Sequence, residues 1–138
     1  MRKIPTLLLA VLMLLSPGAQ AAGGSSRKLE QAQTVFSSAM RWSDYEGAWQ
    51  MVDPALREAQ PLTDLQLERY RQLQVSSYRE GGNGELDDGT VVRSVEIGVI
   101  NRHTQAERAI RYQEKWRWDP KAKRWWQVAG LPDFWEGK

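Results

Sequence analysis

Glu114 lies in a segment whose alternation would turn its carboxyl group toward aromatic residues. Within residues 109–118, the alternating set that contains Glu114 is otherwise apolar and comprises Ile110, Tyr112, Trp116 and Trp118. If the segment is a strand, this carboxyl group points into the interior, where burial raises its pKa and a poised acid can transfer protons. Three roles are open: a general acid or base, a ligand contact, or a structural carboxylate paired with an arginine of the helical layer or with Tyr112.

Other reactive residue types do not form a recognisable catalytic or metal-binding pattern. His103 is the single histidine and the chain has no cysteine, so the sequence offers no zinc-ligand set. The glycines of residues 81–84 lack the Lys-Ser/Thr pair of a phosphate-binding loop, and no serine sits in a Gly-x-Ser-x-Gly elbow. We therefore expect no metal and no cofactor, and Glu114 is the one candidate catalytic residue.

Seven tryptophans supply much of the apolar area that the chain can bury. We expect Trp116, Trp118 and Trp126 to point inward. Trp125 then points to the outer face of the sheet, where it is either covered by the C-terminal segment or forms a contact platform with nearby cations. The predicted surface patch comprises Arg111, Lys115, Arg117 and Trp125.

The N-terminal residues have the features of an export signal. Arg2 and Lys3 precede an apolar run over residues 7–15, and small residues follow at 19–21. The run is far shorter than the roughly 20 residues of a transmembrane helix, so we expect cleavage after Ala21 and no membrane span afterwards. The predicted organisation is a signal peptide at 1–21, a flexible leader at 22–26 and a single domain at 27–138, in the periplasm or secreted.

Charge is balanced overall and uneven along the chain. The net charge of +2 becomes zero once Arg2 and Lys3 are removed, which argues against a nucleic-acid partner. Residues 44–88 carry ten acids against four arginines, whereas residues 102–124 carry eight bases against three acids. Either these two parts face each other in the fold, or the basic part forms an outer sheet face for an anionic envelope partner.

The first half of the domain has helical periodicity and helix-capping patterns. Apolar residues recur on one face from Arg27 onward. Residues 43–46 form a capping box with Ser43 as its N-cap, and residues 63–66 form a second one flanked by a Leu62–Leu67 staple. Asp53-Pro54 should begin a short helix between them.

The second half has the alternation of strands. We expect strands at residues 75–79, 91–100 and 109–118 and around 126–128, joined by turns at 81–84, 87–89, 101–104 and 119–123. A tail follows from residue 131, anchored if Phe134 and Trp135 pack. Helices followed by a curved antiparallel sheet make an α+β fold.

Three segments resemble the NTF2-like superfamily of cone-shaped domains, which includes ketosteroid isomerases and SnoaL-type cyclases. They are residues 44–49 (Asp-Tyr-Glu-Gly-Ala-Trp), the long hairpin of residues 91–100 and 109–118, and residues 124–128 (Arg-Trp-Trp-Gln-Val). The resemblance implies a curved sheet wrapped against helices, with a pocket between them. A cystatin-like fold is the alternative for the same order of elements.

The resemblance implies no particular chemistry, because this fold hosts enzymes, binders and adaptors. We find no match to the tyrosine and two carboxyls of the isomerase members. The leading hypothesis is an exported non-enzymatic domain that binds a small apolar ligand or an envelope protein, with a pocket lined by Trp49, Tyr112, Glu114, Trp116 and Trp126. The alternatives are an isomerase or dehydratase that uses Glu114, and an envelope module that forms a homodimer through its open sheet face.

Overall fold

The computed structural model describes the backbone of residues 18–135 and the side chains of residues 25–135. The predicted signal peptide falls mostly on residues 1–17, which lie outside the described residues, and it stays a prediction. The first helix, α1, spans Gly18–Arg41. It includes residues 22–26, which the sequence analysis assigned to a flexible leader. Among the described helices, none is both long and apolar enough to cross a membrane.

Three short helices follow α1: α2 (Tyr45–Trp49), α3 (Pro54–Ala59) and α4 (Asp64–Arg71). The predicted caps of α3 and α4 are confirmed: Asp53 caps α3 with Pro54 at its start, and Thr63 and Gln66 form a capping box. The predicted cap of α2 is wrong. Asp44 accepts the Gly47 N–H, whereas Ser43 has a φ of 56° and its hydroxyl accepts a hydrogen bond from the Val75 N–H instead.

Four antiparallel strands form one sheet in the order β1-β2-β3-β4. They are β1 (Leu73–Glu85), β2 (Val91–Asn101), β3 (Glu107–Asp119) and β4 (Arg124–Gln127). The turn predicted at residues 81–84 is wrong, because these glycines continue β1 past a register shift between Glu80 and Asn83. The chain turns within residues 86–90, where Gly89 has a φ of 85°, so the turn predicted at residues 87–89 is confirmed.

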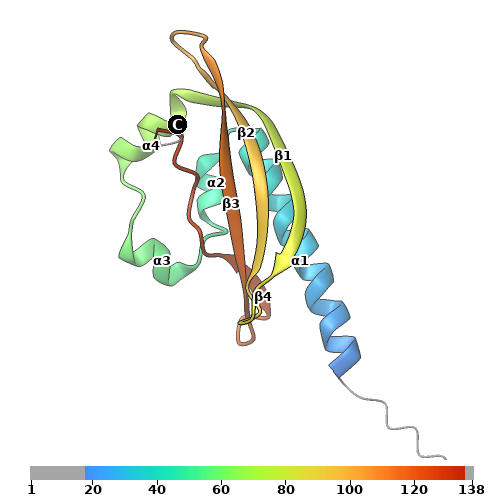
Figure 1. Ribbon diagram of the computed structural model, residues 1–138. Coiled ribbons are helices and arrows are strands. Elements are labelled where there is room, and N and C mark those ends of the chain that lie inside the picture. Colours follow the sequence, from blue (N-terminus) through green and yellow to red (C-terminus); the bar gives the residue numbers. More distant parts are fainter. Residues whose placement is uncertain (1–17, 136–138) are drawn as a thin grey trace, which may run out of the picture.

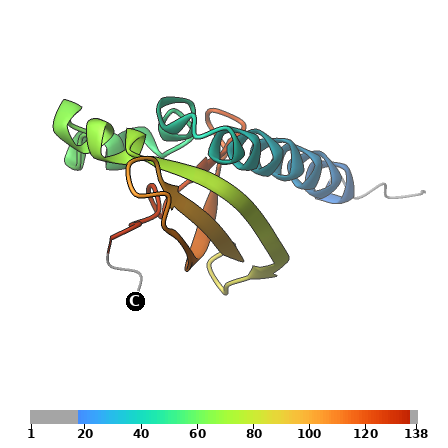
Figure 2. The ribbon, with the colours of Figure 1, turned by 90° about the horizontal axis from the view of Figure 1, so that it is seen from above.

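The predicted α+β architecture is confirmed, with helices on one side of the antiparallel sheet. Figure 1 shows α1 and α2 behind the sheet and α3 and α4 beside β3, and Figure 2 shows β1 bending along its length. We call the sheet face toward α1 the inner face and the opposite face the outer face. The inner face carries the core, in which the buried ring of Phe36 packs edge-on against Trp116 at 5.7 Å.

The corner between α1 and α2 covers part of the edge strand β1. Tyr45 donates its hydroxyl to the Leu73 carbonyl at 2.6 Å, and Arg41 donates to the Tyr78 carbonyl at 2.9 Å. Together with the Ser43 contact to Val75, three backbone groups of this strand are held by side chains of residues 41–45. Such contacts reduce the tendency of an edge strand to pair with another chain.

Residues 128–135, which we call the tail, leave β4 and run between β3 and the short helices α3 and α4 (Figure 1). Phe134 is fully buried and packs against the rings of Tyr45 and Tyr70, at 6.1 and 5.6 Å, and these two rings also contact each other. The Tyr70 hydroxyl donates to the Pro132 carbonyl at 2.8 Å. The predicted anchoring of the tail is therefore confirmed, and the tail forms a wall that faces the helices.

Candidate functional site

Glu114 is fully buried and is surrounded by hydrogen-bond donors. The guanidinium of Arg93 binds both carboxylate oxygens, with Nη2 at 3.0 Å from Oε1 and 2.8 Å from Oε2, and Nε at 3.0 Å from Oε2. The indole N–H of Trp116 donates to Oε1 at 3.0 Å, and the Tyr78 hydroxyl donates to Oε2 at 3.2 Å. Both carboxylate oxygens therefore accept hydrogen bonds from other residues of the protein.

This arrangement gives Glu114 a structural role. Burial raises the pKa of its carboxyl group, while the Arg93 guanidinium and the other donors oppose that rise. Since every partner is a donor, the ionised form satisfies all of them, and neither oxygen is exposed to a substrate. The structural alternative considered from the sequence holds, with one correction: the arginine comes from the neighbouring strand β2 rather than from the helical layer.

Arg93 also connects the sheet to α1. Its Nη2 donates to the Ser37 hydroxyl at 3.0 Å, and beside it the Gln33 amide donates to Asn83 at 2.8 Å. Arg93 was not predicted from the sequence to be part of a site. The signal was present, because Arg93 lies between Val91 and Val95 in the alternating pattern and so belongs to the inner face.

The five residues predicted to line one pocket are not brought together. Glu114 and Trp116 are part of the solid core, and the Tyr112 hydroxyl donates to the Gly130 carbonyl of the tail. Trp126 lies on the outer face, where the Arg124 guanidinium covers its ring at 3.5 Å and Asp119 accepts its N–H at 3.2 Å. Of the five, Trp49 lines a cavity beside the short helices.

Trp125 is not part of a surface patch. Strand β4 pairs it with Trp118, so both rings lie on the inner face with their centroids 5.6 Å apart, and its N–H donates to the Ser25 carbonyl of α1 at 2.7 Å. The prediction was wrong because a one-residue change of register exchanges the faces of two adjacent tryptophans. Arg111, Lys115 and Arg117 are exposed on the outer face, as predicted, and Arg117 binds Asp53.

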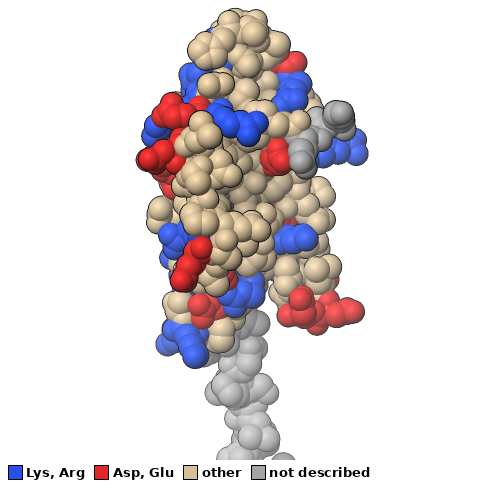
Figure 3. Space-filling view, turned by 90° about the vertical axis from the view of Figure 1, so that its left-hand side faces the viewer, with Lys and Arg blue, Asp and Glu red and all other residues tan. Residues whose placement is uncertain are grey.

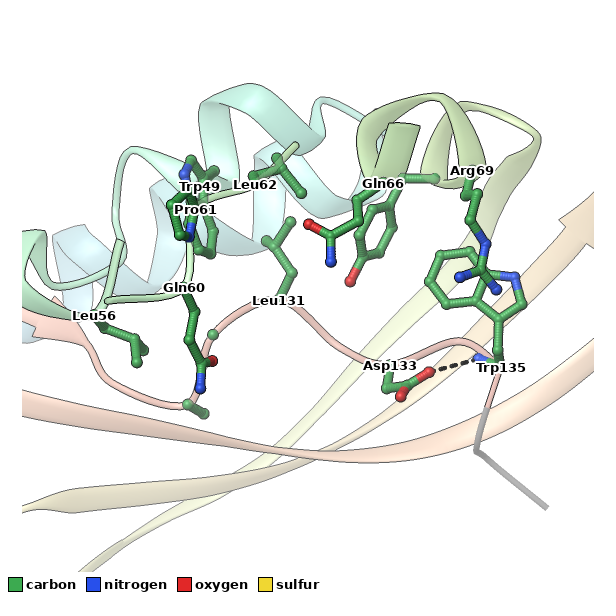
Figure 4. A pocket seen from close by; sticks show the side chains of 13 residues that line it. Trp49, Leu56, Gln60, Pro61, Leu62, Gln66, Arg69, Leu131, Asp133 and Trp135 are labelled. Carbon is green, nitrogen blue, oxygen red and sulfur yellow. Dashed lines mark hydrogen bonds between the residues drawn. The ribbon is translucent and has the colours of Figure 1, made fainter. Parts of the chain in front are cut away.

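A cleft of about 460 Å³ lies between the short helices and the tail (Figure 4). We call it the helix–tail cleft. Its lining residues are Trp49, Leu56, Gln60, Pro61, Leu62, Gln66, Arg69, Tyr70, Ala129, Gly130, Leu131, Asp133 and Trp135. Seen from the side of α3 and α4, the middle of the molecular surface is uncharged and the charged side chains lie toward its borders (Figure 3).

Buried hydrogen bonds fix the tail wall of the cleft. The fully buried Gln127 accepts the N–H groups of Ala129 and Gly130 at 2.9 and 2.7 Å, and its amide donates to the Gly130 carbonyl at 2.7 Å. The same amide donates to the Tyr112 hydroxyl. Gln127 therefore holds the turn that directs Leu131 toward the helices, and the sequence analysis did not identify this role.

The polar groups of the cleft are suited to binding. The Arg69 guanidinium lies over the Trp135 ring at 4.4 Å, Gln66 uses its side-chain oxygen to accept the backbone N–H of Thr63 at 3.1 Å, and Asp133 accepts the backbone N–H of Trp135 at 2.8 Å. Burial and the charge of Asp133 raise the pKa of Tyr70, so its hydroxyl remains a donor to the tail. No nucleophile paired with a base is found among the described lining residues.

In the described part of the chain, no group of three or more His, Cys, Asp or Glu residues could hold a metal ion. His103 lies exposed in the turn between β2 and β3, as expected. Comparison of the chain with protein-family models, curated proteins and solved structures found no match.

Proposed function

We propose that this chain is an exported, non-enzymatic NTF2-like domain that binds a small, largely apolar molecule in the helix–tail cleft. One observation carries the proposal: a cavity of about 460 Å³ between two walls, with the leucines 56, 62 and 131 and the indoles of Trp49 and Trp135 among its lining. Cavities of roughly 300–1,000 Å³ with apolar walls and a few polar groups are typical of small-molecule sites.

Features outside the cleft support the family and the location. The order of helices followed by an antiparallel sheet with helices on one side is compatible with the NTF2-like resemblance. The charged, apolar and small-residue segments of residues 1–21 support export. A small ligand is favoured over an envelope protein as occupant because the cleft is bounded on two sides.

Binding is favoured over catalysis by an isomerase or dehydratase. Such an enzyme would need Glu114 to reach a substrate proton within hydrogen-bond distance. Both of its oxygens are instead held by Arg93, Tyr78 and Trp116, in a part of the core that is separate from the cleft lining.

Titration of the purified protein with decanol, followed by tryptophan fluorescence to which Trp49 and Trp135 of the lining contribute, tests the proposal. We expect saturable binding that Leu131→Gln weakens by about tenfold, since it places a polar group in the apolar wall. The matched control is Leu86→Gln, which changes an exposed leucine in the turn after β1 and should leave binding unchanged. Absence of saturation, or equal effects of the two substitutions, would contradict the proposal.

The outer sheet face supports a second candidate, an envelope interaction module. Arg111, Lys115 and Arg117 are exposed there, and a shallow hollow of about 580 Å³ lies beside Arg79, Glu96 and Arg111. In a two-fold dimer through this face the same cations would meet, so an anionic partner fits better than a second copy. Light scattering tests the point: a wild-type dimer in solution that Arg111→Glu disrupts would oppose this assignment, because this face would then already bind a second copy.

A further inference from the structure

Arg69 differs from the other arginines near the cleft in its contacts. Arg71 binds Glu46 and Glu68, and Arg57 donates to the Val52 carbonyl. For Arg69, by contrast, the side chains and backbone of residues 25–135 provide neither a hydrogen-bond acceptor nor an ion-pair partner for its guanidinium group. Its contact is the face of the Trp135 ring, at 4.4 Å from the ring centroid.

The ring contact holds the guanidinium without using its hydrogen-bond donors. A cation over an indole is attracted by the electrons of the ring face, while the five N–H groups of an arginine remain able to donate. Figure 4 shows Arg69 reaching from α4 over Trp135 at one end of the cleft, with Leu131 in the middle and Leu56 toward the other end. The cleft therefore has a free guanidinium at one end and leucines along its length, with Gln60 and Gln66 among them.

We propose that the ligand is an amphipathic monocarboxylate whose carboxylate binds Arg69 and whose apolar chain lies along Leu131, Leu62 and Leu56. This inference rests on the proposed function, since it names the chemical class of the molecule that the cleft binds. The planar guanidinium matches a carboxylate through paired hydrogen bonds. Gln66 lines the same cleft. Its side-chain oxygen already accepts the Thr63 N–H, and its amide nitrogen can donate to the ligand.

Asp133 limits the charge that this end can accept. It lies on the tail wall and accepts the backbone N–H of Trp135, so it helps to fix the main chain that carries the ring under Arg69, and it places a negative charge near the ligand. A monoanion pairs with Arg69 at a modest repulsion from Asp133. A dianionic phosphate would double both the attraction to Arg69 and the repulsion from Asp133, and its second charge would find no further cation among the described lining residues, so a monocarboxylate is the better match.

Four probes of one chain length test the inference: decanoate, decanol, decylamine and decyl phosphate, titrated at about pH 7.5, where the first is anionic and the third cationic. We expect decanoate to bind about tenfold more tightly than decanol, with decyl phosphate weaker than decanoate and decylamine weakest. Equal binding of decanoate and decanol would overturn the carboxylate assignment and leave the proposed function intact. Failure of all four to saturate the protein would contradict the proposed function itself.

Three substitutions test whether the preference comes from Arg69. In Arg69→Gln, the affinity for decanoate should fall to that for decanol, while the affinity for decanol stays unchanged. Equal weakening of both affinities would show a structural role and overturn the inference. The matched control is Arg79→Gln, which removes the same charge from the outer face, where the Arg79 side chain is 76% exposed. Asp133→Asn keeps an acceptor for the backbone N–H of Trp135 and should increase the affinity for decanoate several-fold. Weaker binding of decanoate would count against the proposed geometry.

Discussion

The carboxylate of Glu114 is enclosed by donors from β1, β2 and β3. Removing a carboxylate and a guanidinium from water costs several kcal/mol for each ion, and the pair offsets that cost only when their geometry is good and the remaining lone pairs are satisfied. Arg93 supplies the paired contact, and Tyr78 and Trp116 supply the remaining donors. The role of this acid is therefore decided by its partners.

Glu114→Gln should lower the free energy of unfolding by about 3 kcal/mol, because it leaves the largely buried Arg93 guanidinium without a counter-charge. Urea denaturation measures the change. The control is Glu96→Gln, which removes a carboxylate that is 51% exposed and 3.9 Å from Arg79 on the outer face, and should cost less than about 0.5 kcal/mol. A loss below about 1 kcal/mol in Glu114→Gln would contradict the structural role.

Asp53 provides a pH-dependent contact between the helices and the sheet. Burial alone would raise the pKa of its carboxyl group. Hydrogen bonds from Arg117 and from the Ala55 N–H outweigh this effect, so the pKa lies below its ordinary value. Because this pKa is lower in the folded than in the unfolded state, the carboxylate stabilises the protein at pH values above the pKa of the unfolded state. That contribution is lost as the pH falls through the unfolded pKa toward the folded one.

Asp53→Asn should cost about 1 kcal/mol at neutral pH, since asparagine still caps α3 while the charge pair with the half-exposed Arg117 is lost. The difference between wild type and variant should shrink as the pH falls from about 5 toward 2, because Asp53 of the wild type becomes protonated there. Urea denaturation at a series of pH values checks this. A difference that persists at the lowest pH would show that the cap was damaged as well.

At the scale of elements, side chains of the corner between α1 and α2 bind backbone groups of the edge strand β1. Arg41, Ser43 and Tyr45 occupy alternate positions of the corner and reach three backbone groups of the strand. Beyond these contacts, the register shift between Glu80 and Asn83 interrupts regular pairing in the glycine-rich part of β1. Both devices make the edge of the sheet a poor template for another strand.

Tyr45→Phe should destabilise the protein by about 1–2 kcal/mol, because the buried Leu73 carbonyl loses its donor and phenylalanine cannot replace it. Thermal unfolding followed by circular dichroism measures the effect. Ser38→Ala, on the exposed side of α1, is the control and should be neutral or slightly stabilising. An unchanged melting temperature in Tyr45→Phe would mean that water or another group satisfies this carbonyl.

At the scale of the whole molecule, the tail completes both the core and the cleft. Phe134 packs against both Tyr45 and Tyr70, and the segment that it anchors presents Leu131 to the helices. The core and the cleft wall thus depend on the same short segment. Loosening the tail should affect stability and ligand binding together.

Phe134→Ala should cost about 3–5 kcal/mol, as expected when a fully buried aromatic ring is removed from a packed core. It should also weaken decanol binding, since the tail wall would no longer be fixed. Urea denaturation and the fluorescence titration measure the two effects, and Leu86→Ala at an exposed position serves as the control. A destabilised variant that binds decanol normally would separate the cleft from the tail.

Local patterns predicted a large part of the fold. The caps at Asp53 and Thr63 and the long hairpin of β2 and β3 follow from side chains within a few residues of each other. The turn predicted at residues 81–84 failed because glycines also permit a strand with a shifted register, and the sequence does not show which neighbour pairs with it.

The sequence by itself determined the order of helices and strands, which residues of β3 point inward, and the absence of disulfides. These features depend on local periodicity and composition. The tertiary structure decided which of Trp125 and Trp126 points inward, which arginine meets Glu114 and where the cleft lies. Those outcomes depend on strand register and on the path of the tail, which bring together residues far apart in the chain. Side-chain alternation has a period of two, so a shift of a single residue reverses every assignment of face.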